Sequence, residues 1–117
     1  MKIAVLLIVK NEADVLPFWL SYMEDKVDYF LFRDNMSDDG SFEIAQAHPK
    51  TVFCERVEGT FRTSLWDKLI VESQQYLSND DWFLINAPDL FPFFNLREKA
   101  NYVTSLKEGY NCISSYY

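Results

Sequence analysis

Glycine is scarce in this chain of 117 residues, and its three positions, Gly40, Gly59 and Gly109, lie far apart. This spacing cannot supply the G-x-G-x-x-G fingerprint of dinucleotide-binding Rossmann enzymes. It also cannot supply the G-x-x-x-x-G-K-[ST] loop that holds phosphates in P-loop NTPases. The sequence therefore argues against both of these classes of nucleotide-binding protein.

Histidine and cysteine are also rare. His48 is the single histidine, and because it stands directly before Pro49, we interpret it as an exposed residue that ends a helix rather than as part of a Ser–His–Asp triad. The two cysteines, Cys54 and Cys112, have no Cys or His neighbour at the spacing of a metal site. We expect both to be reduced core thiols in a cytoplasmic protein.

Positively charged residues are also few, and the chain has no long apolar run near its start. The formal net charge is -7, which argues against nucleic acid or an anionic membrane as partner, because both attract a basic surface. A small phosphate ligand stays compatible, since backbone N–H groups, a local cation or a divalent metal can attract it. The apolar run at residues 3–9 is too short to span a bilayer and has no cleavage site after it. We therefore expect no transmembrane segment and no signal peptide.

The residues that are abundant predict one α/β domain over residues 1–117. Hydrophobic residues make up 49% and aromatic residues 17% of the chain, which is enough for a core rich in rings. Alternating strands and helices predict a mostly parallel open sheet with helices on both faces. The patterns place strands at residues 3–9, 29–32, 51–54, 82–85 and 112–117, and helices at residues 14–23, 42–47, 62–77 and 96–108.

Polar clusters follow three of the predicted strands, at residues 10–12, 34–41 and 86–89. In an open α/β sheet, ligands bind beyond the carboxyl ends of the strands. Each cluster alone also suits a strand-to-helix turn with helix caps. The three together favour a ligand site at this edge.

Three segments carry a further pattern: Val9-Lys10-Asn11-Glu12, Asp34-Asn35-Met36-Ser37-Asp38-Asp39-Gly40-Ser41 and Asp81-Trp82-Phe83-Leu84-Ile85-Asn86. They resemble the first half of family-2 glycosyltransferases, which have the GT-A fold. Their order and spacing match an N-E pair after the first strand, a D-D/N-x-S-x-D-G-S turn after the second, and a D-x-D-type motif after the fourth. The resemblance covers residues 3–117 and implies a nucleotide-sugar-binding domain that takes UDP or a UDP-sugar and transfers the sugar to an acceptor.

The resemblance also implies which residues contact the nucleotide. The first two loops embrace the base and ribose, and a carboxylate at a strand end can accept hydrogen bonds from a uracil N–H or from ribose hydroxyls. Lys10 and Arg62 are the candidate phosphate partners, although Arg62 is equally explained as a surface arginine paired with Glu58. The implied nucleotide-binding residues are Val9, Lys10, Asn11, Glu12, Asp34, Asn35, Arg62, Asn86 and Ala87.

The third motif departs from the family pattern at its metal ligand. Where the family reads approximately D-A-D-E, this chain has Asn86-Ala87-Pro88-Asp89, so the ligand position falls on Pro88, which has no side-chain oxygen. Asp89 is the substitute carboxylate for Mn²⁺ or Mg²⁺. Because hard divalent cations prefer several oxygen ligands, we expect a weak metal dependence.

Family members carry a further half that binds the acceptor and usually supplies the catalytic base. The sequence reaches Tyr117, where that half would begin, so it identifies no base. We therefore expect little sugar transfer by this chain alone, unless partner subunits complete the site. Unpaired edges at the last predicted strand favour a homo-oligomer.

Two other interpretations remain at this point. One is a non-catalytic nucleotide-sugar binding or regulatory module that keeps only the fold. The other is a flavodoxin-like or receiver-like domain. A receiver needs an Asp at the end of the third strand, but here that strand ends near Cys54 and Glu55.

Overall fold

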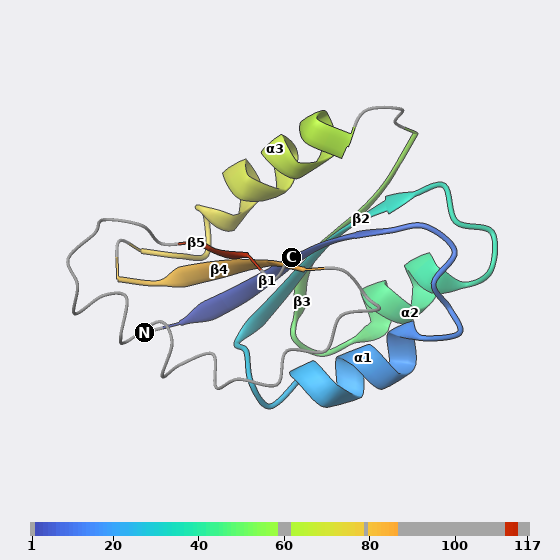
Figure 1. Ribbon diagram of the computed structural model, residues 1–117, viewed down its shortest axis with the longest axis horizontal. Coiled ribbons are helices and arrows are strands. Elements are labelled where there is room, and N and C mark those ends of the chain that lie inside the picture. Colours follow the sequence, from blue (N-terminus) through green and yellow to red (C-terminus); the bar gives the residue numbers. More distant parts are fainter. Residues whose placement is uncertain (1, 59–61, 79, 87–111, 115–117) are drawn as a thin grey trace.

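The computed structural model describes residues 2–58, 62–78, 80–86 and 112–114, and for residues 62–65 and 112–114 it describes the backbone alone. Within these residues, five strands form one sheet in the order β3-β2-β1-β4-β5, and each neighbouring pair is parallel (Figure 1). The prediction of a parallel α/β sheet is therefore confirmed. The strands are β1 (Ile3–Val9), β2 (Tyr29–Asn35), β3 (Thr51–Val57), β4 (Trp82–Asn86) and β5 (Cys112–Ser114).

Helices cover both faces of the sheet, as predicted. α1 and α2 lie on one face, and α3 crosses the other (Figure 1). The helix predicted at residues 96–108 lies outside the described residues, as does the end of the last predicted strand, at 115–117. The helices are α1 (Leu16–Met23), α2 (Ser41–Ala47) and α3 (Arg62–Ser73).

The central strand, β1, is buried between the two helical layers. Because successive side chains of a strand point to opposite faces, its odd-numbered residues pack toward α1 and α2, and its even-numbered residues pack toward α3. Each residue from Ile3 to Leu7 is 0% exposed, which explains the unbroken apolar run in the sequence. The buried cluster under α1 and α2 consists of Ile3, Val5, Leu7, Val9, Leu16, Trp19, Leu20, Met23, Val27, Phe30, Phe32, Ala45, Trp82 and Leu84.

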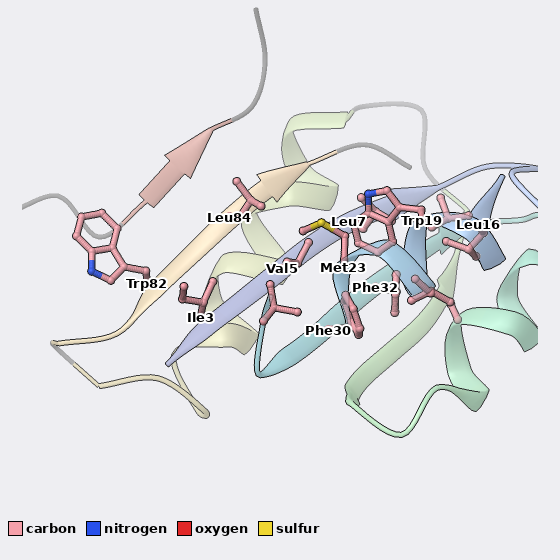
Figure 2. Close-up of a cluster of buried hydrophobic side chains, with 14 residues drawn as sticks. Ile3, Val5, Leu7, Leu16, Trp19, Met23, Phe30, Phe32, Trp82 and Leu84 are labelled. Carbon is pink, nitrogen blue, oxygen red and sulfur yellow. The ribbon is translucent and has the colours of Figure 1, made fainter. Parts of the chain in front are cut away.

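Aromatic rings fill the space between α1 and the sheet. The ring centroid of Trp19 in α1 lies 5.5 Å from that of Phe30 and 6.5 Å from that of Phe32. All three side chains are 0% exposed, and Figure 2 shows them within the buried cluster, together with Leu16 and Met23 of the same helix. These three rings therefore belong to the ring-rich core that the aromatic content predicts.

Local chemistry explains where the two shorter helices begin and end. α1 begins at Leu16, later than predicted. The Leu16 N–H donates to the Glu12 carbonyl at 2.8 Å, but Pro17 has no N–H to continue this pattern to Ala13. α2 ends at Ala47. His48, which follows it, precedes Pro49 and has an extended backbone with φ -69° and ψ 135°, as the proline ring requires of the residue before it.

His48 ends α2 as predicted, but the expectation that it is exposed is wrong. Its side chain is 12% exposed, with Nε2 3.1 Å from Oε2 of Glu24. The ring also stands edge-on to Phe30, with 5.0 Å between ring centroids. The turn after α2 therefore packs against the sheet, and it lies before the amino end of β3, away from the edge where ligands bind in such sheets.

Two strands continue beyond their predicted ends. β2 was predicted to end at residue 32 and β3 at residue 54, but they reach Asn35 and Val57. The added residues are mostly polar, and they are held extended by parallel pairing, for example Arg33 with Glu55 and Asp34 with Arg56. Pairing with neighbouring strands therefore outweighs the low strand preference of these side chains.

At the amino edge of the sheet, Asp81 joins the starts of β1 and β4. Its Oδ1 accepts the backbone N–H of Lys2 at 2.8 Å, and its Oδ2 accepts the backbone N–H of Ser78 at 2.8 Å. Burial alone would raise the pKa of the Asp81 carboxyl, but these hydrogen bonds lower that pKa below its ordinary value. The ionised carboxylate therefore stabilises the fold.

Asp81→Asn should lower the free energy of unfolding by about 1–3 kcal/mol near neutral pH, because an amide offers one oxygen where the carboxylate offers two. Since the folded pKa is depressed, the contribution of Asp81 is present above its unfolded pKa of about 3.9 and is lost as the pH falls through the lower folded value. Urea unfolding across acidic pH measures both effects. The exposed neighbour Asp80 provides the control, and an Asp80→Asn variant that loses as much stability would contradict this role for Asp81.

Candidate functional site

The sheet topology singles out the carboxyl end of β1. From β1 the chain moves outward to β2 and β3, and it then returns to the other side of β1 as β4. The strand order therefore reverses between β1 and β4. In open α/β sheets, the space outside the carboxyl ends of the strands at such a reversal is where ligands bind.

Strand register brings several of the predicted site residues to this edge. Val9 pairs with Asp34, Asp34 pairs with Arg56, and Leu7 pairs with Asn86 on the other side of β1. By strand alternation, Val9, Asp34 and Asn86 share the sheet face that α1 and α2 cover. Asn35, the last residue of β2, is half-buried beside them.

Two segments form the rim of this edge, and hydrogen bonds tie them together. We call residues 10–15, after β1, the first loop and residues 36–40, after β2, the second loop. Five hydrogen bonds join the first loop to the second loop and to Ser41, the first residue of α2. They are Lys10 Nζ to Met36 O (2.9 Å), Asn11 N to Ser37 Oγ (2.9 Å), Glu12 N to Ser41 Oγ (2.8 Å), Ala13 N to Asp39 Oδ2 (3.0 Å) and Asp38 N to Asn11 Oδ1 (2.9 Å).

The backbone at this rim adopts conformations that few residues accept. Asn11 and Met36 both have φ of 51°, and Gly40, before α2, has φ of 94°. Asparagine and glycine accept left-handed backbone with little cost, whereas methionine pays for it in steric strain. The hydrogen bonds from Lys10 Nζ to the Met36 carbonyl and from the Ser37 N–H to Asp34 therefore hold a conformation that methionine itself does not favour.

Asp39 and Ser41 form the centre of the connection between the loops. Ser41 Oγ donates to Asp39 Oδ1 at 2.6 Å, and the Ser41 N–H donates to the same oxygen at 3.1 Å. The hydrogen bond from the Ser41 hydroxyl, helped by the Ala13 N–H, lowers the pKa of the Asp39 carboxyl. Asp39 is therefore ionised and engaged through both oxygens.

Asp34 differs from Asp39 because one of its oxygens accepts no hydrogen bond from the described residues. Its side chain is 1% exposed. Oδ2 accepts the Ser37 N–H at 2.9 Å and lies 3.5 Å from Nε of Arg56. Oδ1 is buried and forms no hydrogen bond within the part of the chain that the structure describes. A buried carboxylate oxygen in this state costs free energy, which a donor from a ligand would recover.

Cys54 lies in the electrostatic environment of Asp34, on the neighbouring strand. Burial raises the pKa of the Cys54 thiol to about 12, and the charge of Asp34 adds to this effect. The thiolate is the nucleophilic form of cysteine. The Cys54 thiol is therefore inert near neutral pH, in agreement with the expectation that it is a reduced core thiol.

The remaining predicted residues have different outcomes. Lys10 is exposed at the rim and Glu12 is half-buried. Arg62 is the first residue of α3, but only its backbone is described, so its predicted contact with phosphate, or alternatively with Glu58, stays a prediction. Ala87 and Asp89 lie outside the described residues, and so does Pro88.

Arg56 was not among the predicted site residues, because the third strand was predicted to end at Cys54. In the structure, Arg56 occupies the same register level as Asp34 and Val9 at the carboxyl edge. The available signal was the charged pair Glu55 and Arg56 directly after an apolar run, which parallels Arg33 and Asp34 at the end of β2.

The described residues hold no group of three or more His, Cys, Asp or Glu side chains placed to bind a metal ion. Over the same part of the chain, each helix is too short or too polar to cross a membrane. No protein-family model matches this chain, and no curated protein matches it either.

Ser41→Ala should lower the free energy of unfolding by about 1–3 kcal/mol, because it removes the acceptor of the half-buried Glu12 N–H. The same substitution should raise the pKa of Asp39 toward its ordinary value. Chemical denaturation measures the first effect, and NMR titration of the Asp39 carboxyl carbon measures the second.

Ser21 is exposed on α1, so Ser21→Ala is the matched control and should leave both quantities unchanged. Hydrogen exchange gives a local check, because the Glu12 amide should exchange faster in Ser41→Ala alone. An unchanged exchange rate at Glu12 in that variant would show that the two loops do not depend on this hydroxyl.

Proposed function

We propose that this chain binds UDP or a UDP-sugar at the carboxyl edge of its sheet, as the nucleotide-binding part of a family-2-like glycosyltransferase of the GT-A type. The observation that carries the proposal is the buried Asp34 carboxylate at the end of β2, whose Oδ1 has no hydrogen-bond partner among the described residues. The parallel sheet, the reversal of strand order beside β1 and the resemblance of the first two loops to that family support it.

The chemistry of Asp34 suits the base or ribose of such a ligand. A uracil N–H or a ribose hydroxyl can donate to the vacant oxygen, and an ionised acceptor makes that hydrogen bond stronger than a neutral one. Because Oδ1 is buried, a ligand group reaches it only by displacing the atoms that now cover it. We therefore expect binding to include a local rearrangement at the rim.

The proposal assigns Lys10 to the phosphates. It is exposed at the rim of the first loop, and its Nζ donates to the Met36 carbonyl at 2.9 Å. An ammonium group has three donor hydrogens, so this hydrogen bond leaves others for a phosphate oxygen. Arg62, at the start of α3, is the second cation that the proposal assigns to the phosphates.

A non-catalytic nucleotide-sugar binding module is the alternative function for the same site. Both functions need UDP to bind, and they differ in turnover. Release of the sugar from a UDP-sugar by the purified chain, measured with and without Mn²⁺, distinguishes a transferase from a binding module.

Asp34→Asn should weaken UDP binding by about 1.5–3 kcal/mol, because the amide can still accept the Ser37 N–H but presents a donor in place of the vacant acceptor. If the base N–H is the ligand donor, the preference for UDP over CDP should fall as well, since the corresponding ring nitrogen of cytosine is an acceptor. Isothermal titration calorimetry measures both affinities.

Asp38→Asn is the matched control, because it removes the same charge from an exposed residue of the second loop. It should leave the affinity for UDP unchanged. A folded Asp34→Asn protein that binds UDP as tightly as the wild type would rule out this role for Asp34.

UDP binding should depend only weakly on divalent metal. Asn86, at the end of β4, is neutral and 1% exposed, and Pro88 offers no side-chain oxygen, so the carboxylates that such a cation prefers are reduced to Asp89. Changing from EDTA to millimolar Mn²⁺ should therefore tighten UDP binding by about tenfold or less, which is roughly 1.4 kcal/mol. A gain of about a hundredfold that disappears in Asp89→Asn would show a working metal site.

A further inference from the structure

Two donors approach one oxygen of Asp34, and no described residue donates to the other. The Ser37 N–H and Nε of Arg56 both approach Oδ2, at 2.9 Å and 3.5 Å. Oδ1 receives no hydrogen bond from the described residues. The carboxylate is therefore held in one orientation by groups that lie on the same side of it.

Arg56 is itself held from three directions. Its guanidinium carbon lies 4.6 Å from the centroid of the Phe42 ring, and its terminal NH2 nitrogen (Nη2) lies 3.5 Å from Oε1 of Glu43. Phe42 and Glu43 both belong to α2, and the third contact is the Asp34 carboxylate on β2. Because these contacts fix the guanidinium between the helix and the sheet, it can act as a rigid support for Asp34.

We propose that Arg56 is a positioning residue for ligand binding: it balances the buried charge of Asp34 and keeps Oδ1 directed at the ligand. This inference rests on the proposed function, and it adds a residue that the sequence resemblance does not name. A buried carboxylate without a cation nearby is costly. If Arg56 is removed, the Asp34 carboxylate can rotate or find another donor, so the acceptor that the ligand needs is lost part of the time.

A double-mutant cycle on the affinity for UDP tests this role, using wild type, Arg56→Gln, Asp34→Asn and the double variant. In the wild-type background, Arg56→Gln should weaken binding by about three- to tenfold. In the Asp34→Asn background, the same substitution should change binding by about twofold or less, because a residue that acts only through Asp34 has no effect once Asp34 is replaced. Calorimetry gives the affinities, and circular dichroism checks that each variant is folded.

Glu43→Gln is the matched control, because it removes the other carboxylate partner of Arg56 without touching Asp34. It should keep the affinity for UDP within about twofold of the wild type. If Arg56→Gln fails to fold, Arg56→Lys takes its place in the cycle, since lysine keeps a cation but lacks the Nε that faces Asp34. The same pattern, with a smaller loss, is then expected.

Three results would overturn the inference. An equal loss from Arg56→Gln in both backgrounds would mean that Arg56 contacts the ligand directly. No loss in the wild-type background would mean that Asp34 needs no support, and a loss in Glu43→Gln as large as in Arg56→Gln would assign the effect to α2. If the wild type does not bind UDP at all, the proposed function itself is contradicted. If binding needs Asp34 but not Arg56, the proposed function stands and only the role of Arg56 is contradicted.

Discussion

Side chains after β2 hold the backbone of the first loop, and the geometry of the carboxyl edge depends on this pairing. Three successive N–H groups, those of residues 11–13, donate to hydroxyl or carboxylate oxygens of residues 37–41. Backbone donors in a loop need partners as much as those in a strand do. The left-handed backbone at Asn11 is therefore possible because the second loop supplies the acceptors, and neither loop has its shape independently of the other.

The aspartates of this sheet use their oxygens in two different ways. Asp81 at the amino edge and Asp39 at the carboxyl edge each accept hydrogen bonds on both carboxylate oxygens. Among the described residues, Asp34 accepts hydrogen bonds on one oxygen only, although it is buried. The first pattern is that of a carboxylate with a structural role, which the protein satisfies by itself. The second pattern leaves a strong acceptor that a ligand can use. This difference within one molecule is why the proposed site centres on Asp34.

Much of the fold could be predicted because apolar runs and helical spacing report burial directly. The unbroken run in β1, the stripe of α3 and the stop at His48-Pro49 all gave elements that the structure contains. The polar ends of β2 and β3 could not be predicted in the same way. Their side chains have a low preference for strands, and pairing with neighbouring strands determines their extended conformation. Arg56 was missed for this reason.

The candidate site was predictable in position but not in its internal contacts. Strand ends with polar clusters indicated the carboxyl edge, and Val9, Asp34 and Asn86 do lie there. The hydrogen bonds between Asn11 and the second loop join residues that are 26 and 27 positions apart, and one sequence carries no record of such pairs. The sequence also could not indicate which oxygen of Asp34 is vacant, because that depends on the placement of Ser37 and Arg56.

The hydrogen bonds between the two loops also limit how this edge can change during evolution or design. A one-residue insertion in the first loop would slide three donors past three acceptors, and a deletion in the second loop would do the same from the other side. Either change alone would leave several partners unmatched at once. New specificity at this edge is therefore best sought by exchanging both loops together as one cassette, or by substituting residues such as Lys10 and Met36, whose side chains reach solvent.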